Sequence, residues 1–133
     1  MKNVKSIEEI REFFKGDRFV NENGAVIEEI GEKSATCSLE ITDSHRNAMG
    51  AVMGGVYFML ADFAFAVAAN WQKMSWVSLH SDISFLSAAK GKKLIAEAVC
   101  IKDGRTTALY RVDVTDDLGN LTATVTVTGY HIG

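Results

Sequence analysis

The spacing of apolar residues predicts a short amphipathic helix near the start of the chain. Ser6 and Glu9 have the spacing of a capping box, in which the serine accepts from the third helical amide and the glutamate reaches back. The apolar residues that follow fall on one helical face: Ile7, Ile10, Phe13 and Phe14. Gly16 supplies a C-terminal stop. We therefore expect a helix of about three turns whose apolar face covers another element.

Short segments of alternating apolar and polar residues, together with one continuous apolar run, predict six strands. Residues 26–30 and 35–41 read as a hairpin joined by a turn at 31–33, and a loop follows at 43–53. Four further strands are expected later in the chain, at residues 77–85, 94–101, 108–114 and 121–127. The third of these six, 77–85, alternates clearly, whereas 94–101 is a nearly continuous apolar run and is typical of a central strand.

Residues 54–70 predict a helix that is apolar nearly all round. Asp62 is the single charge between Asn47 and Trp71, and it separates uncharged runs of 15 and 10 residues. Both runs are shorter than the 18 or so apolar residues of a membrane span, so a helix buried in a globular domain fits better. One face of a flat sheet cannot cover such a helix. Either the sheet curls around it, or a second subunit supplies the missing wall.

This order of elements predicts an α+β fold in a single domain over residues 1–133. Lys plus Arg is 14 and Asp plus Glu is 17, so the formal charge is −3, and the lack of a basic stretch argues against a nucleic-acid partner. Cys37 and Cys100 are too few for a disulfide framework, and charges throughout residues 1–20 argue against a leader. We expect a cytoplasmic protein without a membrane partner.

Asp62 is the first candidate for chemistry because it is a carboxylate within an apolar helix. It could act as a nucleophile or general base, and the alternative is a structural carboxylate that faces solvent or an arginine. Gly54 and Gly55 open the same helix, where free amides and the helix dipole can bind a developing oxyanion. The histidines lack metal-binding spacing, so no metal site is expected: His45, His80 and His131.

The motif that carries most information lies between His45 and Asp62. The run His45–Gly55, then Leu60-Ala61-Asp62, then Ile83–Leu86, resembles the hotdog-fold thioesterases of the phenylacetic-acid-degradation type. The order of elements agrees along nearly the whole chain. The resemblance implies the hotdog fold, in which a curled antiparallel sheet wraps around one long helix, with a short N-terminal helix before it.

The same resemblance implies roles for individual residues. Asp62 would be the nucleophile or general base, and the Gly54 amide would polarise a thioester carbonyl. Asn47 would orient the attacking water or the carbonyl, and Ser78 falls where relatives place a polar group that assists the carboxylate. Met53 stands where the family usually has histidine, directly before the Gly54-Gly55 pair, and the resemblance implies that Met53 and Gly55 contact the substrate. Methionine neither titrates nor donates a strong hydrogen bond, which bears on rate and substrate choice more than on the carboxylate mechanism.

These roles lead to an acyl-CoA thioesterase, which hydrolyses an acyl-CoA to a carboxylic acid and free CoA and needs no cofactor. The alternative is a non-catalytic hotdog protein that binds acyl-thioesters, with Met53 marking lost activity. A hotdog dehydratase is disfavoured by the Leu-Ala-Asp pattern. Four basic residues are candidate contacts for the CoA phosphates, although the lysine cluster is also typical of a solvated loop: Lys90, Lys92, Lys93 and Arg105.

The separation of Gly54 and Asp62 predicts a homodimer. Eight residues of helix span about 12 Å, whereas a reacting carbon needs its oxyanion donor and nucleophile each within about 3–3.5 Å. Two helices packed antiparallel across a two-fold axis would bring Gly54 of one subunit to Asp62 of the other. We therefore expect a homodimer with two equivalent sites, and a dimer of dimers stays open.

Overall fold

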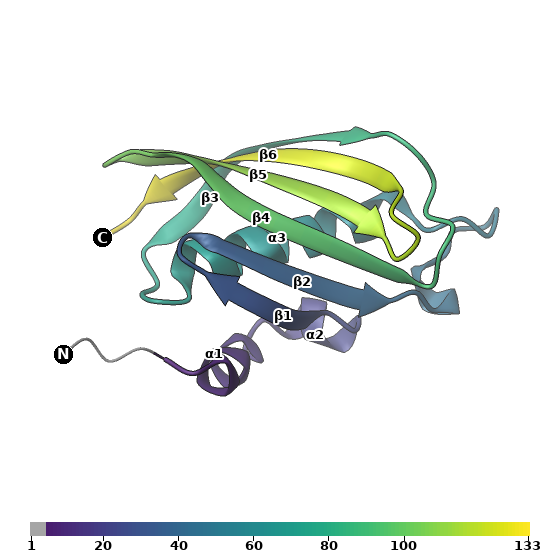
Figure 1. The fold of residues 1–133 in the computed structure, drawn as a ribbon, viewed down its shortest axis with the longest axis horizontal. Helices are drawn as coiled ribbons and strands as arrows, with labels where there is room; N and C mark the ends of the chain where they lie inside the picture. The colour runs from purple at the N-terminus through teal and green to yellow at the C-terminus, as the bar shows by residue number, and fades with distance from the viewer. Residues whose placement is uncertain (1–4) are drawn as a thin grey trace.

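The long apolar helix, α3 (Gly54–Asn70), lies against the concave face of one curled sheet (Figure 1). The computed structural model describes residues 5–133, so the first four residues of the predicted domain lie outside it. The boundaries of α3 are those expected from the sequence, and 11 of its 17 residues are buried. No helix in this part of the chain is long and apolar enough to cross a membrane.

Six antiparallel strands form the sheet in the order β1-β2-β4-β5-β6-β3. The strands are β1 (Val26–Gly31), β2 (Ser34–Glu40), β3 (Trp76–Phe85), β4 (Lys93–Asp103), β5 (Thr107–Asp116) and β6 (Leu121–His131). This confirms the predicted α+β architecture and the interior position of β4. Strands β4, β5 and β6 are longer than predicted, because their backbone pairing continues beyond the residues that show the apolar pattern.

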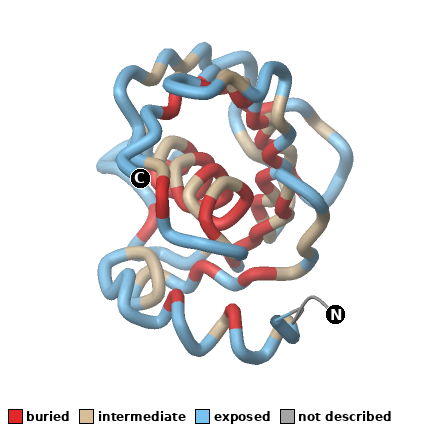
Figure 2. The backbone as a smooth tube through the Cα atoms, turned by 90° about the vertical axis from the view of Figure 1, so that its left-hand side faces the viewer, coloured by how far each residue is buried: buried red, intermediate tan, exposed pale blue. Residues whose placement is uncertain are grey.

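Bulges bend the sheet around the helix. The register shifts at four places, between Ile27 and Glu29, Ser78 and His80, Cys100 and Lys102, and Val114 and Thr115. A bulge adds one residue to one strand and increases the local twist and bend. Figure 2 shows the result, with α3 seen nearly end-on inside the curled backbone and buried segments lining the inner side of the sheet. The sheet therefore supplies most of the wall that α3 requires.

The concave face of the sheet is built from small and branched side chains. Buried alanines on the central strand β4 alternate with positions that face outward, and valines of β5 and β6 continue the buried layer. These fully buried residues include Ala96, Ala98, Val112, Val125 and Val127. Small residues here leave room for the bulky side chains of α3, such as Phe65, whose ring meets Tyr110 edge-on at 5.2 Å.

The N-terminal segment covers the β1 edge of the sheet. Helix α1 (Ile7–Phe14) has the predicted capping box, in which Glu9 N donates to Ser6 Oγ at 3.2 Å and Ser6 N donates to the Glu9 carboxylate at 3.1 Å. From this helix, Arg11 Nε donates to the carbonyl oxygen of Ile27 in β1 at 2.8 Å. An edge strand is exposed to unwanted pairing unless it is covered, and α1 provides that cover.

Two short helical segments were not expected from the sequence. Helix α2 (Arg18–Glu22) follows α1 directly, and the 3-10 turn η1 (Asp43–His45) lies in the predicted loop. Neither is long enough to show a hydrophobic repeat. Asn21 holds α2 in place, because its side-chain amide donates to the carbonyl oxygens of Phe14 and Asp17, both at 2.8 Å.

Asp116 ties the β3–β4 connection to the β5–β6 turn. Its buried carboxylate accepts from the backbone amides of Lys90, Leu118 and Asn120 and from the Asn120 side chain, at 2.9–3.0 Å. Burial by itself raises the pKa of Asp116, but these hydrogen bonds more than offset it and hold the pKa well below its ordinary value. The ionised carboxylate thus fixes the loop that carries the lysine cluster.

We predict that Asp116→Asn lowers the free energy of unfolding at pH 7 by about 1–3 kcal/mol, because amide donors lose a charged acceptor. Since the folded pKa of Asp116 is depressed, its contribution is complete above the unfolded pKa near 4 and fades as the pH falls toward the folded pKa. Urea unfolding at pH 7 and pH 3 should therefore show a smaller difference between the two proteins at pH 3.

The control is Asp103→Asn, which removes the exposed ion pair between Asp103 and Lys33 and should cost less than about 1 kcal/mol at either pH. Equal losses for the two variants would mean that the Asp116 network does not stabilise the fold.

Candidate active site

One stripe of α3 is not covered by the sheet. Gly55, Phe58, Asp62 and Ala66 recur at intervals of three or four residues and are exposed or half-buried, between buried neighbours on both sides. A pocket of about 490 Å³ opens over this stripe, between α3 and α2. Its walls are largely apolar and include Phe19, Val20, Met59 and Phe63. The single charge of the apolar segment therefore lies in a pocket rather than in the core.

Asp62 is a partly desolvated carboxylate. Burial raises its pKa above the ordinary value, and the negative charge of Asp17 raises it further. Among residues 5–133 its carboxylate has no hydrogen-bond or ion-pair partner that would lower the pKa. A carboxylate with raised proton affinity in an apolar pocket is suited to accept a proton or attack a carbonyl. This environment favours the functional reading of Asp62 over a purely structural one.

The N-terminus of α3 offers backbone amides next to an exposed loop. Met53 is its N-cap residue, and no side chain of the described chain caps the helix there. A Cβ at Gly54 would lie 3.1 Å from Cζ of Phe85, so the glycine also allows β3 to approach the helix. Gly55 lies on the Asp62 side of α3 and lines its pocket. Met53 itself is half-exposed beside these glycines.

Asn47 shapes the loop that leads into α3. Its side-chain oxygen accepts from the backbone amides of Met49 and Ala51 at 3.0 and 3.1 Å, and its backbone amide donates to the Ala51 carbonyl oxygen at 2.8 Å. Gly50 completes the turn with a φ of +84°, a conformation that favours glycine. The side-chain NH₂ of Asn47 has no acceptor among residues 5–133 and is left available. Asn47 thus combines a structural oxygen with a free donor.

Ser78 lies on the exposed edge strand β3 and pairs with Gly129 of β6. A Cβ at Gly129 would meet the Phe65 ring of α3 at 3.2 Å, and directly opposed residues share one face of a sheet. Ser78 is therefore on the face that looks toward α3, next to the bulge at residues 78–80.

The single chain does not assemble all the predicted residues into one pocket. Gly55 and Asp62 line the same pocket, whereas, among residues 5–133, Asn47, Gly54 and Ser78 are not part of its lining. Gly54 and Asp62 remain on one straight helix, about 12 Å apart along its axis. Asp17 and Phe19 also line this pocket, although no sequence pattern indicated them, because α2 is too short for a repeat that would have placed them beside Asp62.

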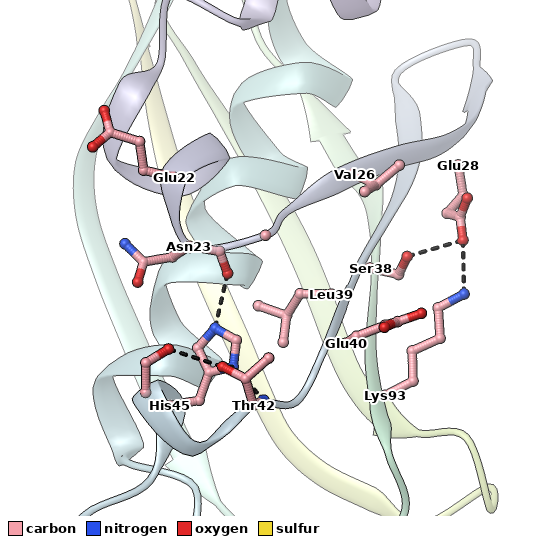
Figure 3. A pocket seen from close by; sticks show the side chains of 12 residues that line it. Glu22, Asn23, Val26, Glu28, Ser38, Leu39, Glu40, Thr42, His45 and Lys93 are labelled. Atoms are coloured by element: carbon pink, nitrogen blue, oxygen red, sulfur yellow. Dashed lines mark hydrogen bonds and ion pairs between the residues drawn. The ribbon is translucent and has the colours of Figure 1, made fainter.

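His45 belongs to a different cavity, of similar volume at about 490 Å³, which Figure 3 shows. The Thr42 amide donates to its Nδ1 at 2.9 Å, so the proton lies on Nε2, which donates to the Asn23 carbonyl oxygen at 2.8 Å. The buried imidazole thereby links the loop before α3 to the end of α2. His45 therefore has a structural role, and it does not substitute for the family histidine whose position Met53 occupies.

The candidate phosphate contacts are divided between two ends of the sheet. Lys90 and Lys92 are exposed on the loop that Asp116 and Asp117 hold. Lys93 instead pairs with Glu28 at 3.0 Å, and this contact together with Ser38 lowers the pKa of Glu28. Arg105 follows the far end of β4, about 33 Å away at the usual rise of a strand. Arg105 therefore does not join the lysine cluster within one chain.

No group of three or more His, Cys, Asp or Glu side chains in residues 5–133 is arranged to hold one metal ion. Within the pocket, the group suited to chemistry is the Asp62 carboxylate, with Gly55 from the start of α3 beside it, whereas Gly54 and the free amide of Asn47 lie outside the pocket lining.

Known proteins of similar sequence are thioesterases or are assigned to the esterases. A family model described as the thioesterase superfamily matches residues 49–123, more than half of the chain. A protein of Archaeoglobus fulgidus assigned to the esterases is 31% identical over 98% of this chain and 86% of its own length. Human acyl-coenzyme A thioesterase 13 is 30% identical over 60% of this chain, a match that spans 59% of the human protein.

Solved structures agree with the fold. The PaaI protein from the phenylacetic acid degradation operon of E. coli superposes with a TM-score of 0.86 at 26% identity, covering 92% of this chain and 89% of that one. A thioesterase protein of Streptococcus pneumoniae, solved with coenzyme A, gives a TM-score of 0.82 at 26% identity and covers 90% and 97%. The chain thus belongs to the thioesterase superfamily, as a thioester hydrolase with the hotdog fold of the PaaI type.

Proposed function

We propose that this protein hydrolyses acyl-CoA thioesters, with Asp62 as the nucleophile or general base. The observation that carries the proposal is a carboxylate with raised pKa, unpaired among residues 5–133, in a mainly apolar pocket of about 490 Å³. Such a pocket suits an apolar acyl group next to a reactive carboxylate. The likeness to acyl-coenzyme A thioesterase 13 and to a structure that contains coenzyme A supports CoA as the thiol carrier.

In the general-base route, the Asp62 carboxylate takes a proton from water as the water oxygen attacks the thioester carbonyl carbon. The carbonyl oxygen becomes an oxyanion, which a backbone amide at the start of α3 stabilises. The tetrahedral intermediate then collapses, the carbon–sulfur bond breaks, and the CoA thiolate receives the proton from Asp62. In the nucleophilic route, Asp62 first displaces the thiolate to form an acyl anhydride, which water hydrolyses. The products are the same.

Two features of the free β3 edge support a homodimer. β1 is a short edge strand covered by α1, whereas the ten-residue β3 has no covering element among residues 5–133. It exposes several large apolar side chains, including Val77, Leu79 and Phe85. A long apolar edge of this kind marks a contact surface. Antiparallel pairing of β3 with the β3 of a second copy would continue the sheet and set the two α3 helices antiparallel.

This arrangement would complete the site that one chain leaves open. If the partner subunit's Gly54 lies level with Asp62, the two-fold axis passes level with residue 58, midway between them. Phe58 would then face its own copy across the axis. The oxyanion donor and the carboxylate would come from different subunits, and two equivalent sites would result. Lys90 and Lys92, whose side chains are exposed, remain the candidate contacts for the CoA phosphates.

We expect Asp62→Asn to lower kcat for acyl-CoA hydrolysis by about 10²–10⁴-fold or more, because the amide can neither accept the proton nor attack. Because the folded pKa of Asp62 is raised, its ionisation makes the fold less stable as the pH rises above the ordinary aspartate pKa of about 4, and the variant should be at least as stable as the wild type at pH 7. Thiol release from a panel of acyl-CoAs and a thermal melt measure the two effects. The exposed Asp43→Asn is the matched control. Wild-type turnover by Asp62→Asn would refute the carboxylate mechanism, and thiol release traced to a contaminating hydrolase would favour the binding-protein alternative.

The two functions of Asn47 can be separated by Asn47→Asp. Aspartate keeps the oxygen that accepts from Met49 and Ala51 and loses the free NH₂ donor. We therefore predict an unchanged melting temperature within about 2 °C and a kcat reduced by about 10-fold or more. Asn47→Ala should lower both the melting temperature and kcat, since it also removes the oxygen that accepts from the loop amides. Full activity of Asn47→Asp would mean that Asn47 acts only through the shape of the loop.

The position of the two-fold axis predicts a crosslink. We expect Phe58→Cys to form a disulfide-linked dimer under mild oxidation, because the two copies of residue 58 meet at the axis. Phe19→Cys, on α2 beside the same pocket, is the control and should stay uncrosslinked. Non-reducing gel electrophoresis reads the result, and light scattering of the wild type should give about twice 14.5 kDa or more. A monomer mass with full activity would rule out the shared site.

A further inference from the structure

The pocket of Asp62 contains a second carboxylate whose presence needs explanation. Asp17 lines it from the start of α2, opposite the α3 stripe. An aspartate at a helix N-cap normally accepts from the first free amides of the helix. Asp17 makes no such bond, and no other hydrogen bond or ion pair to its carboxylate is formed by residues 5–133. The side chain is therefore not used to stabilise α2.

The charges around this pocket leave the two carboxylates uncompensated. Arg18 also lines the pocket, but its guanidinium pairs with Glu22 at 3.6 Å, on the exposed side of α2. On β3, Asp82 pairs with the exposed Thr126 and His80 with Thr128, positions on the face of the sheet that points away from α3. Asp17 is therefore the charged group that acts on Asp62 from the described chain. Partial burial raises the pKa of Asp17 as well.

We propose that Asp17 is a positioning residue for the thioesterase reaction: its charge, held in the same pocket, makes Asp62 a stronger base. Two carboxylates in one apolar site disfavour double ionisation, so each raises the proton affinity of the other. A general base works best when its pKa lies close to the working pH, and an ordinary aspartate is too weak a base at neutral pH. Asp17 touches no reacting atom and acts only through Asp62. This inference rests on the proposed function of Asp62.

The test is the pH dependence of kcat for wild type and Asp17→Asn, which keeps the size of the side chain and removes its charge. The acid limb should move to lower pH by about 0.5–1 unit, because Asp62 loses a neighbouring negative charge. The plateau kcat should fall by a smaller factor, about 1.5–3-fold, since a weaker base transfers the proton less readily. The two profiles then cross, with the variant faster at low pH and slower on the plateau.

A structural role for Asp17 cannot produce this crossing, because a damaged fold lowers kcat at every pH. Asp43→Asn is the matched control: it makes the same change at an exposed aspartate outside the pocket and should leave the profile in place. Profiles that are parallel, or equal shifts for the two variants, would overturn the proposal.

A carboxyl ¹³C NMR titration of aspartate-labelled protein gives a readout that does not depend on turnover. The Asp62 resonance, identified by its loss in Asp62→Asn, should titrate at lower pH in Asp17→Asn than in wild type. An unchanged midpoint would refute the coupling even if hydrolysis is confirmed. A shifted midpoint in a protein that releases no thiol would retain the coupling and refute the proposed function instead.

Discussion

Covering α3 is the constraint on which the rest of the structure depends. A 17-residue helix that is apolar nearly all round cannot lie on a flat sheet without exposing most of its surface. The sheet curls around the helix, with bulges in β1, β3, β4 and β6 that increase its bend. Its inner face uses alanine and valine, so that the larger side chains belong to the helix. The small side chains on the inner face of the sheet thus leave room for the bulky side chains of α3.

The sheet does not surround α3 completely, and the candidate site lies on the uncovered side of this helix. The stripe through Gly55, Phe58, Asp62 and Ala66 is the part of α3 that the sheet does not reach. A carboxylate is tolerated there because it keeps some contact with solvent, yet the surrounding apolar walls still raise its pKa. A position one residue along the helix would bury the charge completely. The same geometry that leaves part of α3 exposed thus creates the partly apolar environment that raises the pKa of Asp62.

Polar anchors outside the helix keep the loops around it in place. Asp116 gathers four donors from two loops, Asn47 closes the turn that leads to α3, and His45 joins that turn to the end of α2. None of these side chains contributes much apolar burial. Their role is to satisfy backbone groups that the sheet and helices leave unpaired, which otherwise would destabilise the loops by about 1–3 kcal/mol each. The resulting loops hold the start of α3 and the lysine cluster in defined positions.

The sequence by itself determined the elements whose signal is local. The apolar run indicated α3, the capping box indicated the start of α1, and the strands were located by period-two alternation or, for β4, by a continuous apolar run, because each signal depends on residues within a few positions of one another. Asp62 was visible as the lone charge of its segment. Only the tertiary structure decided which residues surround it. Asp17 faces it because α2, too short for any repeat, folds back over the α3 stripe, and Arg105 is separated from Lys90 by the length of β4. Such neighbours depend on long-range packing and strand order, which no local pattern records.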